Sequence, residues 1–222
     1  MIKKYKISVP KSTLNEIYKK VRNFPWSAAQ NMNGWEYGTN LNYLKNISKY
    51  WITKYNWKKF ENKINSFKNY KTKVEDINLH FIFEKSKNPN SKPLLLLHGW
   101  PGSITEFLDI IPRLAHPEKF GGKIEDGFDI IVPSLPGFGF SSQIKKALGP
   151  RKIGKILNKF MVKNLGYKNY FVQGGDWGAT IAGWIGLDSS KNCKGIHINC
   201  LPLRHPKGTK NIKEKKWEKK FN

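Results

Sequence analysis

The chain has 222 residues, 39% of them hydrophobic, so it can bury the core of one large domain or two small ones, and its two cysteines exclude a disulfide scaffold. No apolar stretch reaches the roughly 18 residues of a membrane-spanning helix, and the start of the chain lacks a signal peptide, so we expect a soluble, cytoplasmic protein. The formal net charge of +24 suggests a nucleic-acid partner, but only four of the 40 basic residues are Arg and the lysines are scattered, so we expect none.

The first 70 residues predict a helical leader that is rich in aromatic side chains. Apolar residues from Leu14 to Val21 have helical spacing, and Thr13 with Glu16 can form a capping box. Two further helices are expected over residues 41–55 and 57–67. Their aromatic side chains are expected to pack as core against the rest of the chain rather than to bind a ligand: Tyr43, Tyr50, Trp51, Tyr55, Trp57 and Phe60.

Residues 71–206 carry the pattern of an α/β core. Residues 71–84 alternate as two antiparallel strands with a tight turn near Asp76. The apolar runs Leu94–Leu97, Phe128–Val132 and Tyr170–Gln173 suit strands that are buried on both faces, and a helix is expected over residues 152–165. The sequence therefore predicts an α/β fold with a mostly parallel, doubly wound sheet behind a helical leader.

A Gly- and Pro-rich turn, His98-Gly-Trp-Pro-Gly102, follows the leucine strand directly. Trp100-Pro101 is a candidate for a cis peptide bond. The next residues predict a helix from Ser103 to Ile111, with Ser103 as N-cap and Glu106 completing a capping box. The turn would lie at the carboxyl end of a parallel strand, where open α/β sheets place their functional sites.

A second turn, Gly174-Gly-Asp-Trp-Gly178, joins the strand at residues 170–173 to a helix expected over residues 179–187. This is the pattern of a nucleophile elbow with Asp176 in the position that Ser occupies in esterases. A carboxylate there forms an ester by displacement at an sp3 carbon, as opening an epoxide or expelling a halide requires. The backbone N–H groups of Trp100 and Trp177 are the predicted oxyanion donors, while their indoles are left open between wall packing and ligand contact.

These two turns, together with Pro133-Ser-Leu-Pro-Gly-Phe-Gly-Phe-Ser141, resemble the epoxide hydrolases of the α/β-hydrolase fold. Within that group the leader resembles the microsomal and juvenile-hormone type. The segments that carry this likeness are Phe24–Trp26, Gly34–Gly38, Tyr50–Trp51, Tyr55–Trp57 and Leu79–Phe83. The resemblance runs from about residue 5 to about residue 206. It implies a leader over residues 1–70, a partial α/β-hydrolase core over residues 71–206, and a basic tail or the start of a lid over residues 207–222.

The resemblance also implies a two-step hydrolysis of a small apolar epoxide, with no metal or organic cofactor. In that family the elbow Asp, here Asp176, attacks an epoxide carbon while two lid tyrosines protonate the leaving oxygen. A His, oriented by an acid, then activates water against the resulting ester. The amides that correspond to Trp100 and Trp177 hold the oxyanion.

The sequence departs from the family pattern in its length, since it stops at Asn222 where family members continue with the lid and the last core strands. The lid tyrosines, the catalytic His and its acid partner are therefore expected outside it, and we expect poor or no turnover and an aggregation-prone sheet edge. His98 belongs to the oxyanion turn, and His197 is expected to have a structural role on a strand. The other histidines, His80, His116 and His205, match no motif.

Two other functions stay open. A haloalkane dehalogenase shares the Asp-Trp elbow, although such enzymes typically carry an Asn where this chain has Trp100. A protein that only binds apolar ligands is the alternative without catalysis. Cys193 and Cys200 are expected to be free thiols, and no spacing of metal ligands is present.

Overall fold

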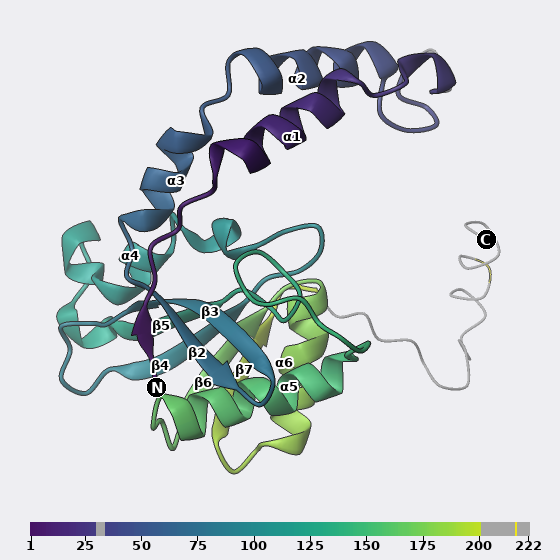
Figure 1. The fold of residues 1–222 in the computed structure, drawn as a ribbon. Coiled ribbons are helices and arrows are strands. Elements are labelled where there is room, and N and C mark those ends of the chain that lie inside the picture. The colour runs from purple at the N-terminus through teal and green to yellow at the C-terminus, as the bar shows by residue number, and fades with distance from the viewer. Residues whose placement is uncertain (30–33, 201–215, 217–222) are drawn as a thin grey trace. The chain divides into compact units, whose positions relative to one another are not determined.

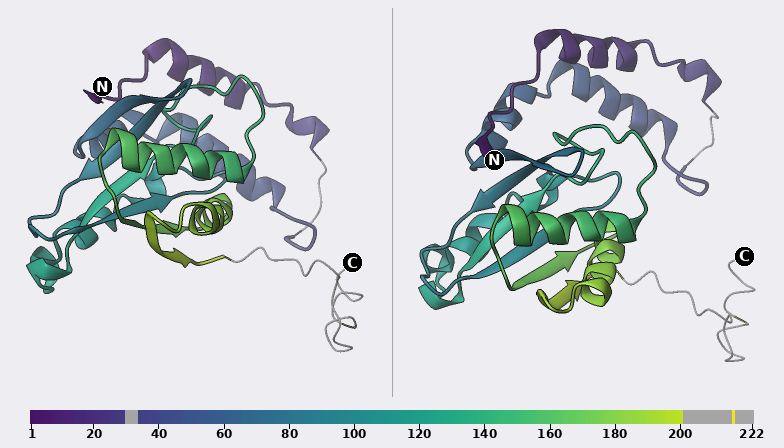
Figure 2. Two further views of the ribbon diagram at one scale, coloured as in Figure 1. Left: turned by 90° about the horizontal axis from the view of Figure 1, so that it is seen from below. Right: turned by 60° about the horizontal axis from the view of Figure 1, so that its bottom comes forward.

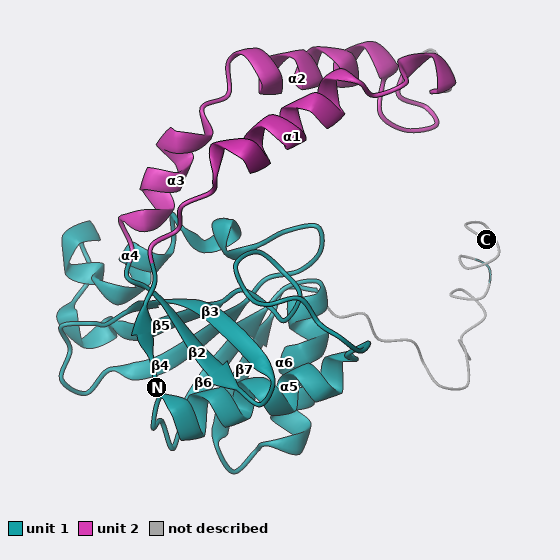
Figure 3. Cartoon of the chain, in the orientation of Figure 1, with its two compact units in different colours: residues 1–5, 68–222 teal, residues 6–67 magenta. Residues whose placement is uncertain are grey.

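The computed structural model describes residues 1–29, 34–200 and 216, and these divide into two compact units (Figure 3). The core unit contains residues 1–5 and the described residues from 68 onward, and the leader unit contains residues 6–67. His205 and the predicted tail at residues 207–222, apart from Lys216, lie outside the described residues.

The core unit is built on a mixed sheet of seven described strands in the order β1-β2-β3-β5-β4-β6-β7 (Figure 1). The neighbours from β1 to β5 pair antiparallel, and β5, β4, β6 and β7 pair parallel. The predicted α/β fold class is therefore correct, although the sheet is mixed rather than mostly parallel. The strands are β1 (Lys3–Lys4), β2 (Asn69–Val74), β3 (Ile77–Glu84), β4 (Lys92–Leu97), β5 (Phe128–Pro133), β6 (Tyr170–Gly174) and β7 (Cys193–Ile198).

One face of this sheet packs against two helices, α5 (Pro150–Lys159), which continues as a π-helical turn over Phe160–Asn164, and α6 (Trp177–Asp188). Figure 2 shows α5 and α6 beside each other. Alternate strand residues point to the same face, and α5 presents apolar residues at helical spacing, so the two patterns bury each other. The resulting core includes Leu79, Phe81, Leu95, Leu97, Ile131 and Val172 from strands, and Ile153, Ile156, Leu157, Phe160, Ile181 and Ile185 from helices.

The hairpin predicted over residues 71–84 is confirmed. β2 and β3 pair antiparallel from Val74 with Ile77 onward, and Glu75 in the turn has a φ of 56°. A non-glycine residue in the left-handed region is uncommon, and here it permits the tight two-residue connection. β1 pairs with β2 and so adds a third antiparallel strand to the hairpin. β3 pairs with β5, which joins the hairpin to the parallel strands.

The continuous helix predicted from Ser103 to Ile111 is wrong. The chain forms a 3-10 turn, η2 (Ile104–Phe107), and then a separate short helix, α4 (Ile111–Ala115). Pro112 lies in the first turn of α4, where its missing N–H costs nothing, but in a helix running through from Ser103 it would lose a backbone bond. Ser103 does cap the 3-10 turn, since its hydroxyl accepts the N–H of Thr105 at 3.3 Å.

The leader unit contains α1 (Lys11–Arg22), the short turn η1 (Trp26–Ala28), α2 (Leu41–Thr53) and α3 (Trp57–Asn65). The three predicted helices are present. The capping box of Thr13 and Glu16 is wrong, because α1 starts at Lys11, directly after Pro10, without a side-chain cap. By contrast, α2 and α3 start at asparagine caps, with Asn40 accepting the N–H of Tyr43 at 3.0 Å and Asn56 that of Lys59 at 3.1 Å.

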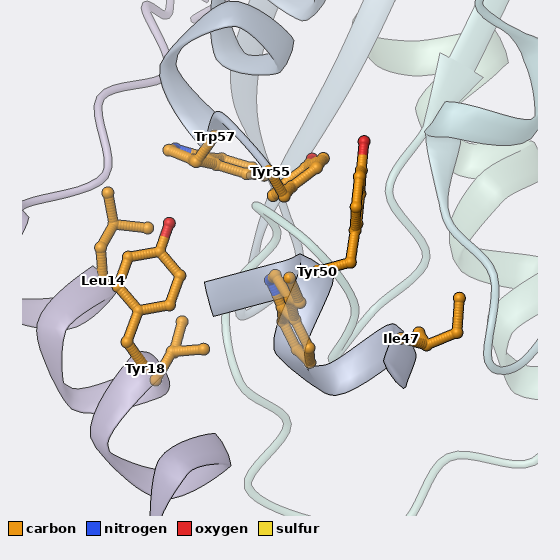
Figure 4. A pocket seen from close by; sticks show the side chains of 8 residues that line it. Leu14, Tyr18, Ile47, Tyr50, Tyr55 and Trp57 are labelled. Atoms are coloured by element: carbon orange, nitrogen blue, oxygen red, sulfur yellow. The ribbon is translucent and has the colours of Figure 1, made fainter. Parts of the chain in front are cut away.

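Aromatic side chains of the leader unit are more exposed than the sequence predicts. Tyr43, Tyr50 and Trp51 on α2 are 51%, 54% and 43% exposed, so the expectation that they form core is wrong for these three. A cavity of about 440 Å³ lies within this unit between α1, α2 and the start of α3, and Figure 4 shows Tyr18, Tyr55 and other residues that line it. None of the helices in the described ranges has the length and apolar character that a bilayer span requires.

Candidate active site

The turn between β6 and α6 has the geometry of a nucleophile elbow. Asp176 lies between Gly174, where β6 ends, and Trp177, where α6 begins, with φ 49° and ψ −121°. A non-glycine residue in such a conformation costs on the order of 1–3 kcal/mol and is held there only by its surroundings. The conformation leaves the carboxylate exposed at the carboxyl end of the central strands.

Two glycines make this turn possible. A Cβ atom at Gly178 would overlap the Leu97 carbonyl on β4, and one at Gly174 would overlap the backbone of Gly178. The first turn of α6 therefore touches the neighbouring strand directly, which side chains at these positions would prevent. The spacing of small residues around Asp176 in the sequence reflects this close approach.

The Asp176 carboxylate is held by backbone amides from both turns. The N–H of Trp100 donates to Asp176 Oδ1 at 2.9 Å, and the N–H of Trp177 also bonds to the carboxylate. These bonds, that of Trp100 first and that of Trp177 second, hold the pKa of Asp176 below its usual range, because they stabilise the charged form. The structure thus brings together all three predicted site residues.

His98 anchors the turn at residues 98–102 to the rest of the core unit. Its ring is fully buried, with Nε2 accepting the N–H of Leu135 at 3.0 Å and Nδ1 lying 3.0 Å from the carbonyl of Gly99. Since Nε2 accepts, Nδ1 carries the proton and donates to Gly99. Burial lowers the pKa of His98, so the ring is neutral and serves as a fixed link between the turn and the loop after β5.

Three other histidines are described. His80 is buried, with Nδ1 2.9 Å from Ser134 Oγ and Nε2 3.0 Å from Asn69 Oδ1, and burial lowers its pKa to about 3. His116 Nε2 lies 3.2 Å from Glu84 Oε1. His197 is on β7 as predicted, and it is exposed rather than built into the core. His80 and His98 are thus each held by two partners, and His116 by one, outside the Asp176 turn.

The indoles beside the elbow do not fill the interior. Trp100 is 68% exposed and Trp177 is 46% exposed, so both indole side chains are available to a ligand. The Trp100-Pro101 peptide bond is cis, as the sequence suggested. Both cysteines are free, Cys193 buried at the start of β7 and Cys200 exposed after it. Among the described residues, no cluster of three His, Cys, Asp or Glu side chains is placed to hold a metal ion.

Sequence reasoning missed one neighbour of this site. The carboxylate of Glu106 bonds to the backbone N–H of Gly99, which lies directly before Trp100, in addition to the expected N–H of Ser103. The spacing of Ser103 and Glu106 indicates the capping contact alone. The bond to Gly99 depends on how the turn folds back, which the spacing does not specify.

Comparison with known proteins agrees with the fold. The family model described as epoxide hydrolase N terminus matches residues 2–107, and that described as alpha/beta hydrolase fold matches residues 92–217. A putative epoxide hydrolase of Stigmatella aurantiaca is 39% identical over 203 residues, which cover 91% of this chain and 46% of that protein. Epoxide hydrolase 1 of Oryctolagus cuniculus is 36% identical, over 92% of this chain and 46% of the relative.

Solved structures show the same likeness. The juvenile hormone epoxide hydrolase of the silkworm Bombyx mori superposes with a TM-score of 0.81 at 32% identity, over 93% of this chain and 49% of that one. The chain spans about half the length of the curated relatives that it matches. The hydrolase-fold model covers more than half of the chain, and the leader matches the N-terminal region of epoxide hydrolases. The chain therefore belongs to the alpha/beta hydrolase fold family, and the relatives that it resembles within that family are epoxide hydrolases.

Proposed function

We propose that this chain carries the nucleophile and the oxyanion donors of an epoxide hydrolase that acts on small apolar epoxides without a cofactor. Asp176 is the proposed nucleophile, and the N–H groups of Trp100 and Trp177 are the proposed oxyanion donors. The observation that carries the proposal is the 2.9 Å bond from the Trp100 N–H to an exposed carboxylate on a strained elbow. The cytoplasmic location expected from the sequence stays a prediction.

The chemistry follows from the ionised carboxylate. Its lowered pKa keeps Asp176 charged at neutral pH, so an oxygen of the carboxylate can attack a ring carbon of the epoxide. The bond from that carbon to the ring oxygen breaks, the oxygen takes up a proton, and an alkyl ester of Asp176 is formed. Water then loses a proton and adds to the ester carbonyl, and the oxyanion that forms accepts hydrogen bonds from the two N–H groups. This intermediate releases the diol and restores the carboxylate of Asp176.

The first step needs the Asp176 carboxylate and a proton for the leaving oxygen, which solvent water can supply, whereas the second step needs a base. Burial lowers the pKa of His80 and of His98, and both rings are engaged by neighbouring groups. These two rings are therefore poor candidates for activating water at the ester. We propose that the chain by itself forms the ester and hydrolyses it slowly.

Mass spectrometry after exposure to styrene oxide tests this proposal. We expect one covalent adduct that maps to Asp176, and no adduct in the Asp176→Asn variant, because an amide is a far weaker nucleophile than a carboxylate. Asp126→Asn is a matched control that removes another exposed carboxylate and should keep the adduct.

The same experiment separates the alternatives. Reversible binding without an adduct would indicate a binding protein and would contradict the proposal. Transfer from a chloroalkane with release of chloride, together with no reaction with the epoxide, would indicate a dehalogenase. An adduct on a different residue would remove Asp176 from its proposed role.

A further inference from the structure

The carboxylate of Glu106 lies inside the turn that carries the first oxyanion donor. It bonds to the backbone N–H of Gly99 on one side of Trp100 and to that of Ser103 on the other. A Cβ atom at Gly102 would overlap Glu106 Oε1, so the turn is wrapped closely around this group. Glu106 thus contacts the chain both before and after the residue whose N–H faces Asp176.

The position of Glu106 is itself well fixed. It belongs to η2, which is capped by Ser103 and anchored by Ile104, a side chain that is only 1% exposed. The hydroxyls of Ser103 and Thr105 lie 2.8 Å apart, and the N–H of Glu106 donates to the Ser103 carbonyl at 3.1 Å. Because η2 is held by its own hydrogen bonds, it can keep the Glu106 carboxylate, and with it the turn, in one position.

A carboxylate suits this place better than other side chains do. Two backbone N–H groups at opposite ends of a tight turn need two acceptors, and an ionised carboxylate provides two oxygens. The negative charge of Asp176 disfavours the ionised form of Glu106. Burial of the Glu106 carboxylate raises its pKa, the bonds from Gly99 and Ser103 lower it, and the nearby charge of Asp176 raises it again. On balance the pKa of Glu106 is raised, so its charged form relies on the two backbone bonds that favour it.

We propose that Glu106 is a positioning residue, which holds Gly99 and Ser103 so that the N–H of Trp100 stays directed at Asp176. This inference rests on the proposed function, in which that N–H is an oxyanion donor. Glu106 itself does not touch the substrate. Its loss would let the turn relax and would misdirect one of the two donors.

Two measurements on the full chain test the role of Glu106. The first is hydrogen exchange of the Trp100 amide, which should be faster in Glu106→Ala than in the wild type. The second is decay of the Asp176 ester after styrene oxide treatment, which should slow by roughly tenfold or more, since losing one oxyanion donor outright costs about 100- to 1000-fold. Glu106→Gln keeps one acceptor oxygen, so its exchange rate and its ester decay rate should lie between those of the wild type and of Glu106→Ala.

The controls separate the possible failures. Glu125→Gln removes an exposed carboxylate elsewhere in the core unit and should change neither measurement. If the wild type forms no ester, the proposed function fails, and the exchange of the Trp100 amide still decides the positioning role. Unchanged exchange, or an unchanged decay of the ester in Glu106→Ala, overturns the proposal. If Glu106→Ala does not fold, the same outcomes apply to Glu106→Gln.

Discussion

His80 is held in the core unit by hydrogen bonds at both ring nitrogens. Ser134, in the loop after β5, and Asn69 at the start of β2 provide the partners. The ring therefore joins the antiparallel hairpin to the loop beside the proposed site. Because burial lowers its pKa to about 3, the folded protein keeps His80 neutral at pH values where an unfolded chain protonates it.

This difference predicts a loss of stability in acid. A folded-state pKa below the unfolded value of about 6.5 gives a contribution that is fully present above pH 6.5 and is lost as the pH falls toward 3. The contribution is at most about 5 kcal/mol. We expect the difference in unfolding free energy between wild type and His80→Gln to shrink across this window, as measured by urea denaturation at several pH values. A difference that does not vary with pH would contradict the prediction, and His197→Gln is the control for loss of an exposed histidine.

The candidate site illustrates which residues a sequence can predict. Asp176 and the N–H of Trp177 follow from one local strand-turn-helix pattern, and the N–H of Trp100 follows from a second, because each turn and its glycines lie close together in sequence. The partners of His80 are 11 and 54 residues away, so its network depends on strand register and was not predictable. The contact of Glu106 with Gly99 is local but depends on how the turn folds back. The catalytic roles of Asp176, Trp100 and Trp177 stay predictions.

Helix α6 depends on which of its glycines touches a neighbour. Gly178 in its first turn lies against the Leu97 carbonyl, whereas Gly183 in the same helix has open space around it. Glycine within a helix is less stable than alanine by about 0.5–1 kcal/mol when nothing else intervenes. Substitution by alanine should therefore change the free energy of unfolding in opposite directions at Gly178 and Gly183.

We expect Gly183→Ala to raise the free energy of unfolding by about 0.5–1 kcal/mol. Gly178→Ala should lower it by about 1–3 kcal/mol, because the added methyl group pushes α6 away from β4. Urea denaturation midpoints measure both changes. Two shifts of the same sign would show that the close approach at the elbow does not limit stability.

Strands were predicted more reliably than helix boundaries. The apolar runs of β4, β5 and β6 are continuous, and the order of strands and turns is typical of a parallel sheet, so these elements are confirmed. The helix after Ser103 was predicted as one continuous element because its apolar spacing does not reveal that the chain forms a 3-10 turn there and starts a new helix at Ile111. The exposure of Tyr43 and Tyr50 was also missed, because apolar spacing alone does not say what covers a helix face.

The excess of positive charge is spread through the chain rather than gathered in one motif. Arg151 is one of only four arginines, and it forms a fork with Asp188 at 2.8 Å and stacks over Trp184 at 4.6 Å. Its charge is thus used inside the core unit to join α5 and α6. Most of the remaining positive charge belongs to lysine, which binds phosphate as a point charge without reading bases.

We therefore expect any binding of duplex DNA to be weak, independent of sequence and removed by physiological salt. Fluorescence anisotropy with two unrelated duplexes over a salt series measures this, because nonspecific binding falls steeply as salt rises. Binding that prefers one duplex and persists at about 0.2 M salt would contradict the prediction.

The amides of Trp100 and Trp177 already donate hydrogen bonds to the Asp176 carboxylate before any substrate binds. In the proposed reaction, negative charge leaves this group as it attacks carbon and comes back when water adds to the ester. The same two donors therefore slow alkylation and speed deacylation. The electrophile has to contribute the missing driving force itself, and a three-membered ring does so by releasing its angle strain. An unstrained ether of the same shape and polarity should bind and leave unchanged.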